Sequence, residues 1–280
     1  MQAFNYHSHT YRCGHADLDM TDEDYVKDYI KMGFKRMAFT DHCPEKNEID
    51  KRNNMRMKYS KRKEYLENIQ ALKEKYAGQI EIQSGYEIEY LPGEEENLKE
   101  LKEETDKLIL GQHFIYDDNK QLIIFGKHDF SDKELLRYAE YIEQAMKLKL
   151  LDIIAHPDFC MLKRKTFGEI EAKVAHLICK AAEKYDVPLE INLNNIFKYT
   201  YYEKGVLNHN PIEEQKKKLQ KVVYPCKDFW KIASEYDIHV LYGIDAHHKG
   251  QVVLFKELVE LANEIIGKDV IEKLNFIDIK

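Results

Sequence analysis

Short apolar runs alternate along this chain with longer segments in which apolar residues recur at helical spacing. The apolar runs are predicted strands, and they cover residues 4–7, 36–40, 80–87, 108–113, 151–156, 188–192 and 239–244. The longer segments are predicted helices, and they include residues 22–32, 58–76, 132–148, 169–185 and 251–266. Strands that alternate with helices pair in parallel. The pattern therefore predicts an α/β fold with seven parallel strands.

The strand at residues 151–155 is largely apolar rather than strictly alternating, which is typical of a strand covered on both faces. We expect the sheet to close into a TIM-like barrel with helices outside, and 280 residues suit one such domain over residues 1–280. Thr21, followed by Asp24, and Ser131 are predicted to cap the helices that follow them. Residues 197–211, rich in tyrosine and asparagine, are predicted to form a long loop beside the sixth strand.

Composition narrows the classes of partner and compartment. Fifty acidic and 43 basic side chains give a net charge of −7, which disfavours long nucleic acid as a partner. The five cysteines are odd in number, widely spaced and without a C-x-x-C pair, so neither a disulfide framework nor a zinc ribbon is expected. No run approaches the roughly 18 apolar residues of a membrane span, and no apolar signal segment is expected at the N-terminus. We therefore predict a cytoplasmic protein without a membrane partner.

Histidine or acidic residues stand at or just beyond the ends of nearly all the predicted strands. They are His7, His9, His42, Glu87, His113, His156, Asp245 and His247. The carboxyl ends of parallel strands share one rim, so these side chains are expected to converge on a multinuclear metal site. Imidazole and carboxylate together suit zinc, iron or manganese better than magnesium alone. Glu87 could bridge two cations about 3.5–4 Å apart, a separation at which a shared water becomes a hydroxide nucleophile.

The motifs around these residues make the chain resemble the PHP (polymerase and histidinol phosphatase) family. They are H-S-H-T at 7–10, C-G-H at 13–15, T-D-H at 40–42, G-Y-E at 85–87, G-Q-H at 111–113, A-H-P-D at 155–158, E-I-N at 190–192 and G-I-D-A-H at 243–247. The resemblance runs from the first strand to the last and is greatest to the monofunctional histidinol-phosphate phosphatases. It implies a distorted seven-stranded (β/α) barrel and three divalent metal ions.

The resemblance also implies which residues hold each metal. The first would be bound by His7, His9, Glu87 and Asp245, the second by Glu87, His113 and His156, and the third by His15, His42 and His247. Glu87, His42 and Asp245 would be the catalytic residues. The implied reaction is hydrolysis of a small phosphate monoester, most specifically L-histidinol phosphate to L-histidinol and phosphate in histidine biosynthesis, through a metal-bridging hydroxide that attacks phosphorus in line.

A dianionic ester also needs fixed cationic groups, and Arg12, Lys163, Arg164 and Lys198 follow strand ends. Asn192 and Asp158 could bind the ammonium and imidazole ends of histidinol. The family often follows E-I-N with a Gly-Leu-Arg-like stretch, whereas this chain carries asparagines and then Lys198. The motifs therefore specify the metal chemistry more closely than they specify the substrate.

Several alternatives stay open. The same metals could serve a PHP phosphoesterase acting on nucleotides or nucleic-acid ends, a metal-dependent amidohydrolase, or a non-catalytic metal-binding protein.

Glu89 shares the face of Glu87, although a salt bridge is the favoured role for it. Asp41 and Asp158 could orient imidazoles from behind. Cys13 and Cys43 flank ligands, and packing is favoured over a role as thiolate ligands. Four histidines outside the motifs, His128, His176, His209 and His239, are predicted to be structural or surface residues. The native metal and the oligomeric state are not specified.

Overall fold

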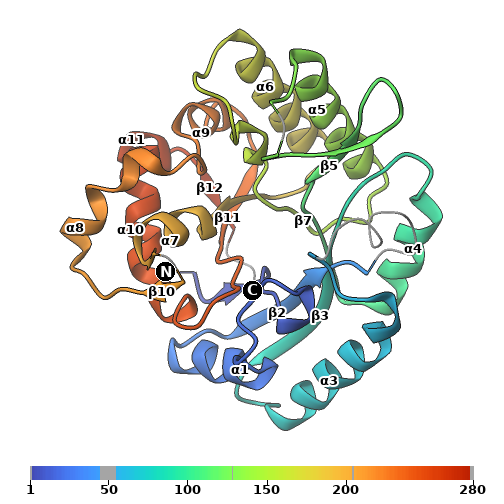
Figure 1. Cartoon of the computed structure of the whole chain (residues 1–280), viewed down its shortest axis with the longest axis vertical. Helices are drawn as coiled ribbons and strands as arrows, with labels where there is room; N and C mark the ends of the chain where they lie inside the picture. Colours follow the sequence, from blue (N-terminus) through green and yellow to red (C-terminus); the bar gives the residue numbers. More distant parts are fainter. Residues whose placement is uncertain (1, 45–54, 128, 204, 278–280) are drawn as a thin grey trace.

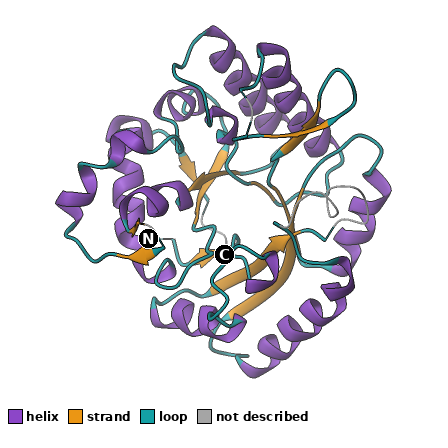
Figure 2. Ribbon diagram, viewed as in Figure 1, coloured by secondary structure: helices purple, strands orange, loops and turns teal. Residues whose placement is uncertain are grey.

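A single curled sheet of eight parallel strands, in the order β1-β2-β3-β4-β7-β8-β11-β12, organises the fold. The computed structural model describes residues 2–44, 55–127, 129–203 and 205–277. The strands are β1 (Phe4–Asn5), β2 (Arg36–His42), β3 (Glu81–Ile88), β4 (Lys107–Leu110), β7 (Ile153–Ile154), β8 (Leu189–Asn192), β11 (His239–Gly243) and β12 (Asn275–Phe276). Helices surround the outside of this sheet (Figures 1 and 2).

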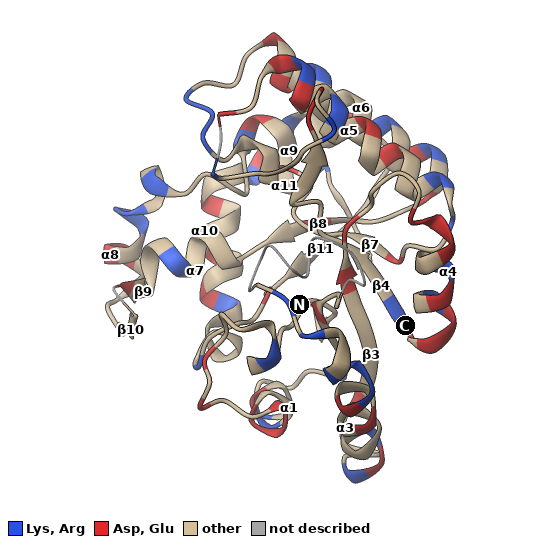
Figure 3. Cartoon of the chain, turned by 45° about the vertical axis from the view of Figure 1, so that its right-hand side comes forward, with Lys and Arg blue, Asp and Glu red and all other residues tan. Residues whose placement is uncertain are grey.

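The helices lie mostly between successive strands, as the alternating pattern predicts. They are α1 (Asp22–Lys31), α3 (Arg62–Lys75), α4 (Glu95–Glu104), α5 (Asp132–Lys147), α6 (Glu169–Tyr185), α7 (Asn194–Thr200), α8 (Ile212–Lys216), α9 (Lys227–Ala233), α10 (Phe255–Ile266) and α11 (Lys268–Ile271). Thr21 and Ser131 cap α1 and α5 in reciprocal capping boxes with Asp24 and Glu134, so both predicted caps are confirmed. Charged residues of both signs occur mainly along these outer helices (Figure 3).

The core has an inner and an outer layer because strand residues alternate between the two faces of the sheet. On β2, Ala38 belongs to the inner apolar cluster, whereas its neighbours Met37 and Phe39 belong to the outer cluster. The inner cluster contains Phe4, Tyr6, Ala38, Ile109, Ile153, Ala155 and Leu241. It fills the inside of the curl, so polar side chains can gather at the mouth without opening a channel through the sheet.

The segment after β1 hydrogen-bonds to the segment after β11. The backbone N–H of His9 donates to the carbonyl of Ala246 at 2.9 Å, and the N–H of Ala246 donates to the carbonyl of His7 at 3.3 Å. The Gln2 side chain adds two further bonds to the backbone of Tyr242, at 2.7 and 3.0 Å. These contacts bring together ligand motifs that lie at opposite ends of the chain.

The structure departs from the predicted elements in three places. The seven predicted strands all occur, but β12 adds an eighth, whose two residues are too short for a periodic signal. The predicted loop at 197–211 instead begins within α7 and continues into a hairpin of β9 (Tyr202–Glu203) and β10 (Val206–Leu207). A second unpredicted hairpin joins β5 (Phe114–Tyr116) to β6 (Leu122–Ile124). No helix in the described ranges is both long and apolar enough to cross a membrane.

Candidate metal centre

The predicted ligand residues occupy the carboxyl ends of the sheet strands. His42 is the last residue of β2 and Glu87 is the last but one of β3, while His113, His156 and Asp245 lie two or three residues beyond β4, β7 and β11. All nine predicted ligand side chains meet there, including His15 from the loop after β1. The convergence predicted from the strand order is therefore observed in the geometry.

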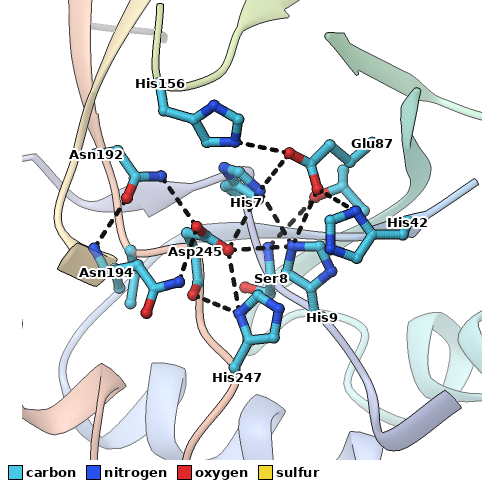
Figure 4. A network of polar contacts seen from close by, with 12 residues as sticks. His7, Ser8, His9, His42, Glu87, His156, Asn192, Asn194, Asp245 and His247 are labelled. Carbon is cyan, nitrogen blue, oxygen red and sulfur yellow. Dashed lines mark hydrogen bonds and ion pairs between the residues drawn. The ribbon is translucent and has the colours of Figure 1, made fainter. Parts of the chain in front are cut away.

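The Glu87 carboxylate lies at the middle of this cluster and is 1% exposed. Its Oε1 atom is 2.9 Å from Nε2 of His156 and 3.8 Å from Nε2 of His113. Its Oε2 atom is 2.7 Å from Nδ1 of His42 and 3.4 Å from Nε2 of His9. Figure 4 shows the rings of His9, His42 and His156 directed at the carboxylate from different sides. Each oxygen thus faces a different set of imidazoles, as a carboxylate between two cations would require.

Asp245 joins the first and last ligand motifs. Its Oδ1 atom is 3.1 Å from Nε2 of His9, 3.5 Å from Nε2 of His7 and 3.1 Å from Nδ1 of His247. The Nε2 atoms of His7 and His9 are themselves only 3.1 Å apart. Two buried imidazole nitrogens that face each other and one carboxylate oxygen form a donor set suited to a divalent cation.

The three residues predicted to hold a third cation also lie together. The ring centroid of His15 is 4.6 Å from that of His247 and 5.2 Å from that of His42. His247 is 3% exposed, and its Nε2 atom has no hydrogen-bond partner among the described residues. A buried polar atom without a partner is rare in a folded protein, and a cation is one means of satisfying it.

Two of the predicted ligand residues adopt backbone conformations that non-glycine residues rarely use. His156 has a φ of 30° and Asp245 a φ of 51°. The extended strand that would have placed Asp245 and His247 on one face is therefore interrupted, although both side chains still reach the centre. Such conformations cost on the order of 1–3 kcal/mol each and persist where the surroundings impose them, most often at functional sites.

Buried acids behind the cluster orient the imidazoles. Glu190 is fully buried and accepts from Nδ1 of His7 at 2.9 Å, and Glu89 accepts from Nδ1 of His113 at 2.9 Å. Glu89 also pairs with Arg56, which confirms the salt-bridge role favoured for it. Asp41 lies 3.4 Å from Nδ1 of His9, consistent with its predicted orienting role. Each of these contacts leaves the opposite ring nitrogen facing the centre.

Sequence reasoning assigned no role to Glu190, although it is part of the E-I-N motif. A charged residue inside an apolar strand is itself a signal, because a buried carboxylate must have a partner. Two motif glycines also have a structural purpose that their sequence context did not reveal. A Cβ atom at Gly111 would overlap the Glu87 side chain, and one at Gly243 would overlap Glu190. Both glycines therefore make room for a buried carboxylate.

Burial and neighbouring charges shift the pKa values of the clustered side chains in different directions. Burial, aided by the neighbouring imidazoles, lowers the pKa of His247 to about 4 and that of His15 to about 2. Burial would raise the pKa of Glu87, but the adjacent histidines outweigh it and hold that pKa well below its usual range. Burial opposes protonation of His9, yet Asp245, Asp41 and Glu87 raise its pKa to about 9. Imidazole binds cations in its neutral form, so His15 and His247 are suited to that role as they stand, whereas His9 would have to release a proton.

A cavity of about 250 Å³ opens above the cluster. It is lined by His15, His42, Met55, Glu87, His113, His156, Phe159, Leu162, Asn194, Asn195, Lys198, Tyr224, Asp245 and His247. Phe159 packs on the rings of His113 and His156, with centroids 4.9 and 5.0 Å away, and on Tyr224. One wall of the cavity is thus aromatic, while its floor consists of the predicted metal ligands.

Lys198 alone of the predicted substrate-binding residues lines this cavity, and within the described residues it forms no ion pair. Arg12 instead binds the carboxylate of Asp22, at 2.8 and 3.0 Å. Arg164 binds Glu171 and the carbonyl of Phe130, which holds the start of α6. These two arginines therefore do not supply cations to the cavity. Side-chain reach, which sequence position does not fix, accounts for both corrections.

Lys163, Asn192 and Asp158, which were also predicted to bind the substrate, do not line the cavity either. Lys163 is exposed and does not line the cavity. Asn192 is fully buried and uses its amide to donate to Glu190 at 2.6 Å and Asp245 at 3.2 Å, so it supports the ligands. Asn194, for which no role was predicted, donates to the same Asp245 oxygen at 3.0 Å. Asp158 is fully buried and accepts from the backbone N–H of Cys226 and from the indole of Trp230, which fixes the segment that carries Tyr224.

The histidines outside the motifs occupy peripheral positions where they are described. His176 hydrogen-bonds to Tyr236 on the surface, and His239 pairs with Asp186. His248 pairs with Asp17 and stacks on the ring of Tyr202. His128 lies outside the described residues.

Comparison with known proteins matches this arrangement to one family. The PHP domain family matches residues 5–194. The chain is 27% identical over 271 residues to a protein of Deinococcus radiodurans named "Probable histidinol-phosphatase", and the match covers 94% of each chain. It is 29% identical over 151 residues to the histidinol-phosphatase of Bacillus subtilis, a match that covers 51% of this chain and 55% of the relative.

Two solved structures share the fold. A candidate histidinol phosphatase of Listeria monocytogenes superposes with a TM-score of 0.68 at 22% identity, covering 89% of this chain and 96% of the other. The histidinol phosphate phosphatase of Lactococcus lactis, complexed with zinc, L-histidinol and phosphate, gives a TM-score of 0.63 at 15% identity, covering 93% and 94%. The family match spans more than half of the sequence and includes most of the ligand motifs. The chain therefore belongs to the PHP domain family.

Proposed function

We propose that this chain is a metal-dependent phosphatase that hydrolyses L-histidinol phosphate to L-histidinol and phosphate, as a single domain over residues 1–280. The observation that carries the proposal is the Glu87 carboxylate, which is buried among five imidazoles from four other segments of the chain. Burying a carboxylate and so many imidazoles is costly unless charge compensates it, and clustered divalent cations provide that compensation. The relative of Deinococcus radiodurans, aligned over 94% of both chains, supports the choice of substrate.

The ligand positions suit three divalent cations. His7, His9, Glu87 and Asp245 would hold one, Glu87, His113 and His156 a second, and His15, His42 and His247 a third. Zinc, iron and manganese fit these nitrogen and carboxylate donors. When bound, such cations neutralise the phosphate oxygens and make a water molecule nucleophilic at neutral pH. A barrel of PHP type, closed where the segments after β1 and β11 meet, keeps the three positions next to one another.

The chain's own residues contribute position and charge. Glu190 and Glu89 fix the rings of His7 and His113, and Asn192 and Asn194 hold Asp245 by its other oxygen. Pre-organised groups of this kind do not have to rearrange during the reaction, which is the main source of electrostatic catalysis. Glu87, His42 and Asp245 would be the catalytic residues because each reaches the reacting centre from the cavity floor.

The cavity walls suit a small phosphorylated ligand with a flat ring. Lys198 supplies a positive charge at the mouth, where it can meet a phosphate oxygen. Phe159 and Tyr224 offer apolar faces on which an imidazole ring can lie. All five cysteines are unpaired, which supports the predicted reducing compartment, the cytoplasm.

The experiment that tests the proposal is a phosphatase screen on protein of measured metal content. L-histidinol phosphate is compared with sugar phosphates, nucleotides and a single-stranded oligonucleotide at equal concentration. We expect histidinol phosphate to have the highest kcat/KM and chelation of the metal to abolish turnover. A higher kcat/KM on nucleotides or on the oligonucleotide, or full activity after chelation, would refute the proposal.

A further inference from the structure

Cys13 lies among the predicted ligands of the third cation, although its residue type suggested packing. Its side chain is fully buried. Its Sγ atom and one ring nitrogen each of His15 and His247 all lie within 4.8 Å of one another. The three atoms therefore form a possible cation site made of one sulfur and two nitrogens.

The two imidazoles in this group have their other nitrogens occupied. Nδ1 of His15 lies 3.3 Å from the carbonyl oxygen of Cys13, and Nδ1 of His247 lies 2.9 Å from the carbonyl oxygen of Asp245. Each carbonyl accepts a hydrogen from the ring, so the tautomer is fixed with the lone pair on Nε2. The Nε2 atom of His247 is buried and has no hydrogen-bond partner within the described ranges. This unpartnered nitrogen is an independent indication that a cation binds at this position.

The backbone next to Cys13 donates hydrogen bonds to its sulfur, as backbone amides do to a thiolate. Cys13 ends a short 3-10 turn (Tyr11–Cys13), and Gly14 follows with a φ of 81°, a conformation that glycine adopts without strain. The backbone N–H groups of His15 and Ala16 then hydrogen-bond to Sγ. Amide donors to sulfur stabilise the negative thiolate.

We propose that Cys13 is a ligand of the third cation together with His15, His42 and His247, an inference that rests on the proposed metal centre. Coordination breaks the S–H bond, forms a metal–sulfur bond and releases the proton to solvent. One thiolate and three imidazoles form a complete tetrahedral set for zinc, and the soft sulfur disfavours manganese. The other two positions contain only nitrogen and oxygen donors. The third position is therefore selective for zinc, while the other two accept a wider range of metals.

Cobalt(II) reports sulfur ligation directly, because a thiolate bound to it gives a charge-transfer absorption band in the near ultraviolet. The metal-free full-length chain is titrated with Co²⁺, and the spectrum is recorded together with the cobalt content. We expect the band in the wild type and in the control Cys179→Ala, which removes another buried thiol on α6. We expect Cys13→Ser to lose the band. A wild type that binds three equivalents of Co²⁺ without the band, or a Cys13→Ser variant that keeps it, would overturn the inference.

X-ray absorption at the zinc edge of the zinc-loaded wild type tests the same point without a substitution, in case Cys13→Ser does not fold. A zinc–sulfur distance of about 2.3 Å is expected, from one sulfur per chain. A spectrum with only nitrogen and oxygen neighbours would overturn the inference while leaving the phosphatase proposal intact. A chain that binds no divalent cation would overturn both.

Discussion

The substitution Gly111→Ala tests whether the position of the Glu87 carboxylate controls activity. A Cβ atom at residue 111 would lie 2.7 Å from Cγ of Glu87 and closer still to its carboxylate, whereas ordinary van der Waals contact begins at 3.4 Å. Cγ must therefore move by at least about 0.7 Å, and the carboxylate by more. Misplacement of a reacting group by about 1 Å can reduce the rate about 100-fold, which corresponds to about 2.7 kcal/mol of transition-state stabilisation.

The assay is release of inorganic phosphate from L-histidinol phosphate, with metal content and melting temperature measured on the same samples. We expect kcat/KM of Gly111→Ala to fall about 100-fold and at least one cation to be lost. Gly168→Ala is the matched control, because its Cβ atom would meet only the flexible end of Glu171, at 3.3 Å, at the start of α6. The reasoning is refuted if Gly111→Ala keeps kcat/KM within threefold of the wild type with its full metal content.

Three further predictions concern single side chains around the cavity. Lys198→Ala should raise KM for a phosphorylated substrate about tenfold with little change in kcat, because it removes a charge that meets the phosphate, and an unchanged KM would exclude it from the phosphate site. His247→Ala should lower the bound metal by one equivalent per chain, and a full complement would contradict its role as ligand. Burial raises the pKa of Asp158 from 3.8 to about 6. The ionised carboxylate therefore lowers the free energy of unfolding progressively as the pH rises from 3.8 through about 6. Asp158→Asn should therefore stabilise the metal-free chain by up to about 3 kcal/mol at pH 8 but not at pH 4, with KM unchanged, and a lower melting temperature at pH 8 would count against this account.

The ligand cluster could be predicted from sequence because it depends mainly on topology. A histidine or acid at the end of an apolar run is brought to the common rim whenever the strands are parallel, regardless of the loops between them. His42 and Glu87 show this most directly, since both lie within their strands. The helix α6 was predicted with its observed bounds, and the caps Thr21 and Ser131 follow from local chemistry that needs no tertiary information.

The substrate side of the site could not be predicted in the same way. Arg12 and Arg164 follow strand ends as the ligands do, but their long side chains turn to carboxylates outside the cavity. Which way such a side chain turns depends on partners that are distant in the sequence. The cavity wall also depends on α7 and on Tyr224, which lie in segments without a clear periodic pattern. Packing against the completed barrel decides their positions.

Anomalous diffraction from crystals of the zinc-loaded chain tests the central claim most directly, because it locates each cation without assuming its ligands. The account predicts two anomalous peaks that share the Glu87 carboxylate, about 3.5–4 Å apart, with a third beside His15 and His247. A zinc-loaded crystal in which no peak lies within bonding distance of Glu87 would contradict it.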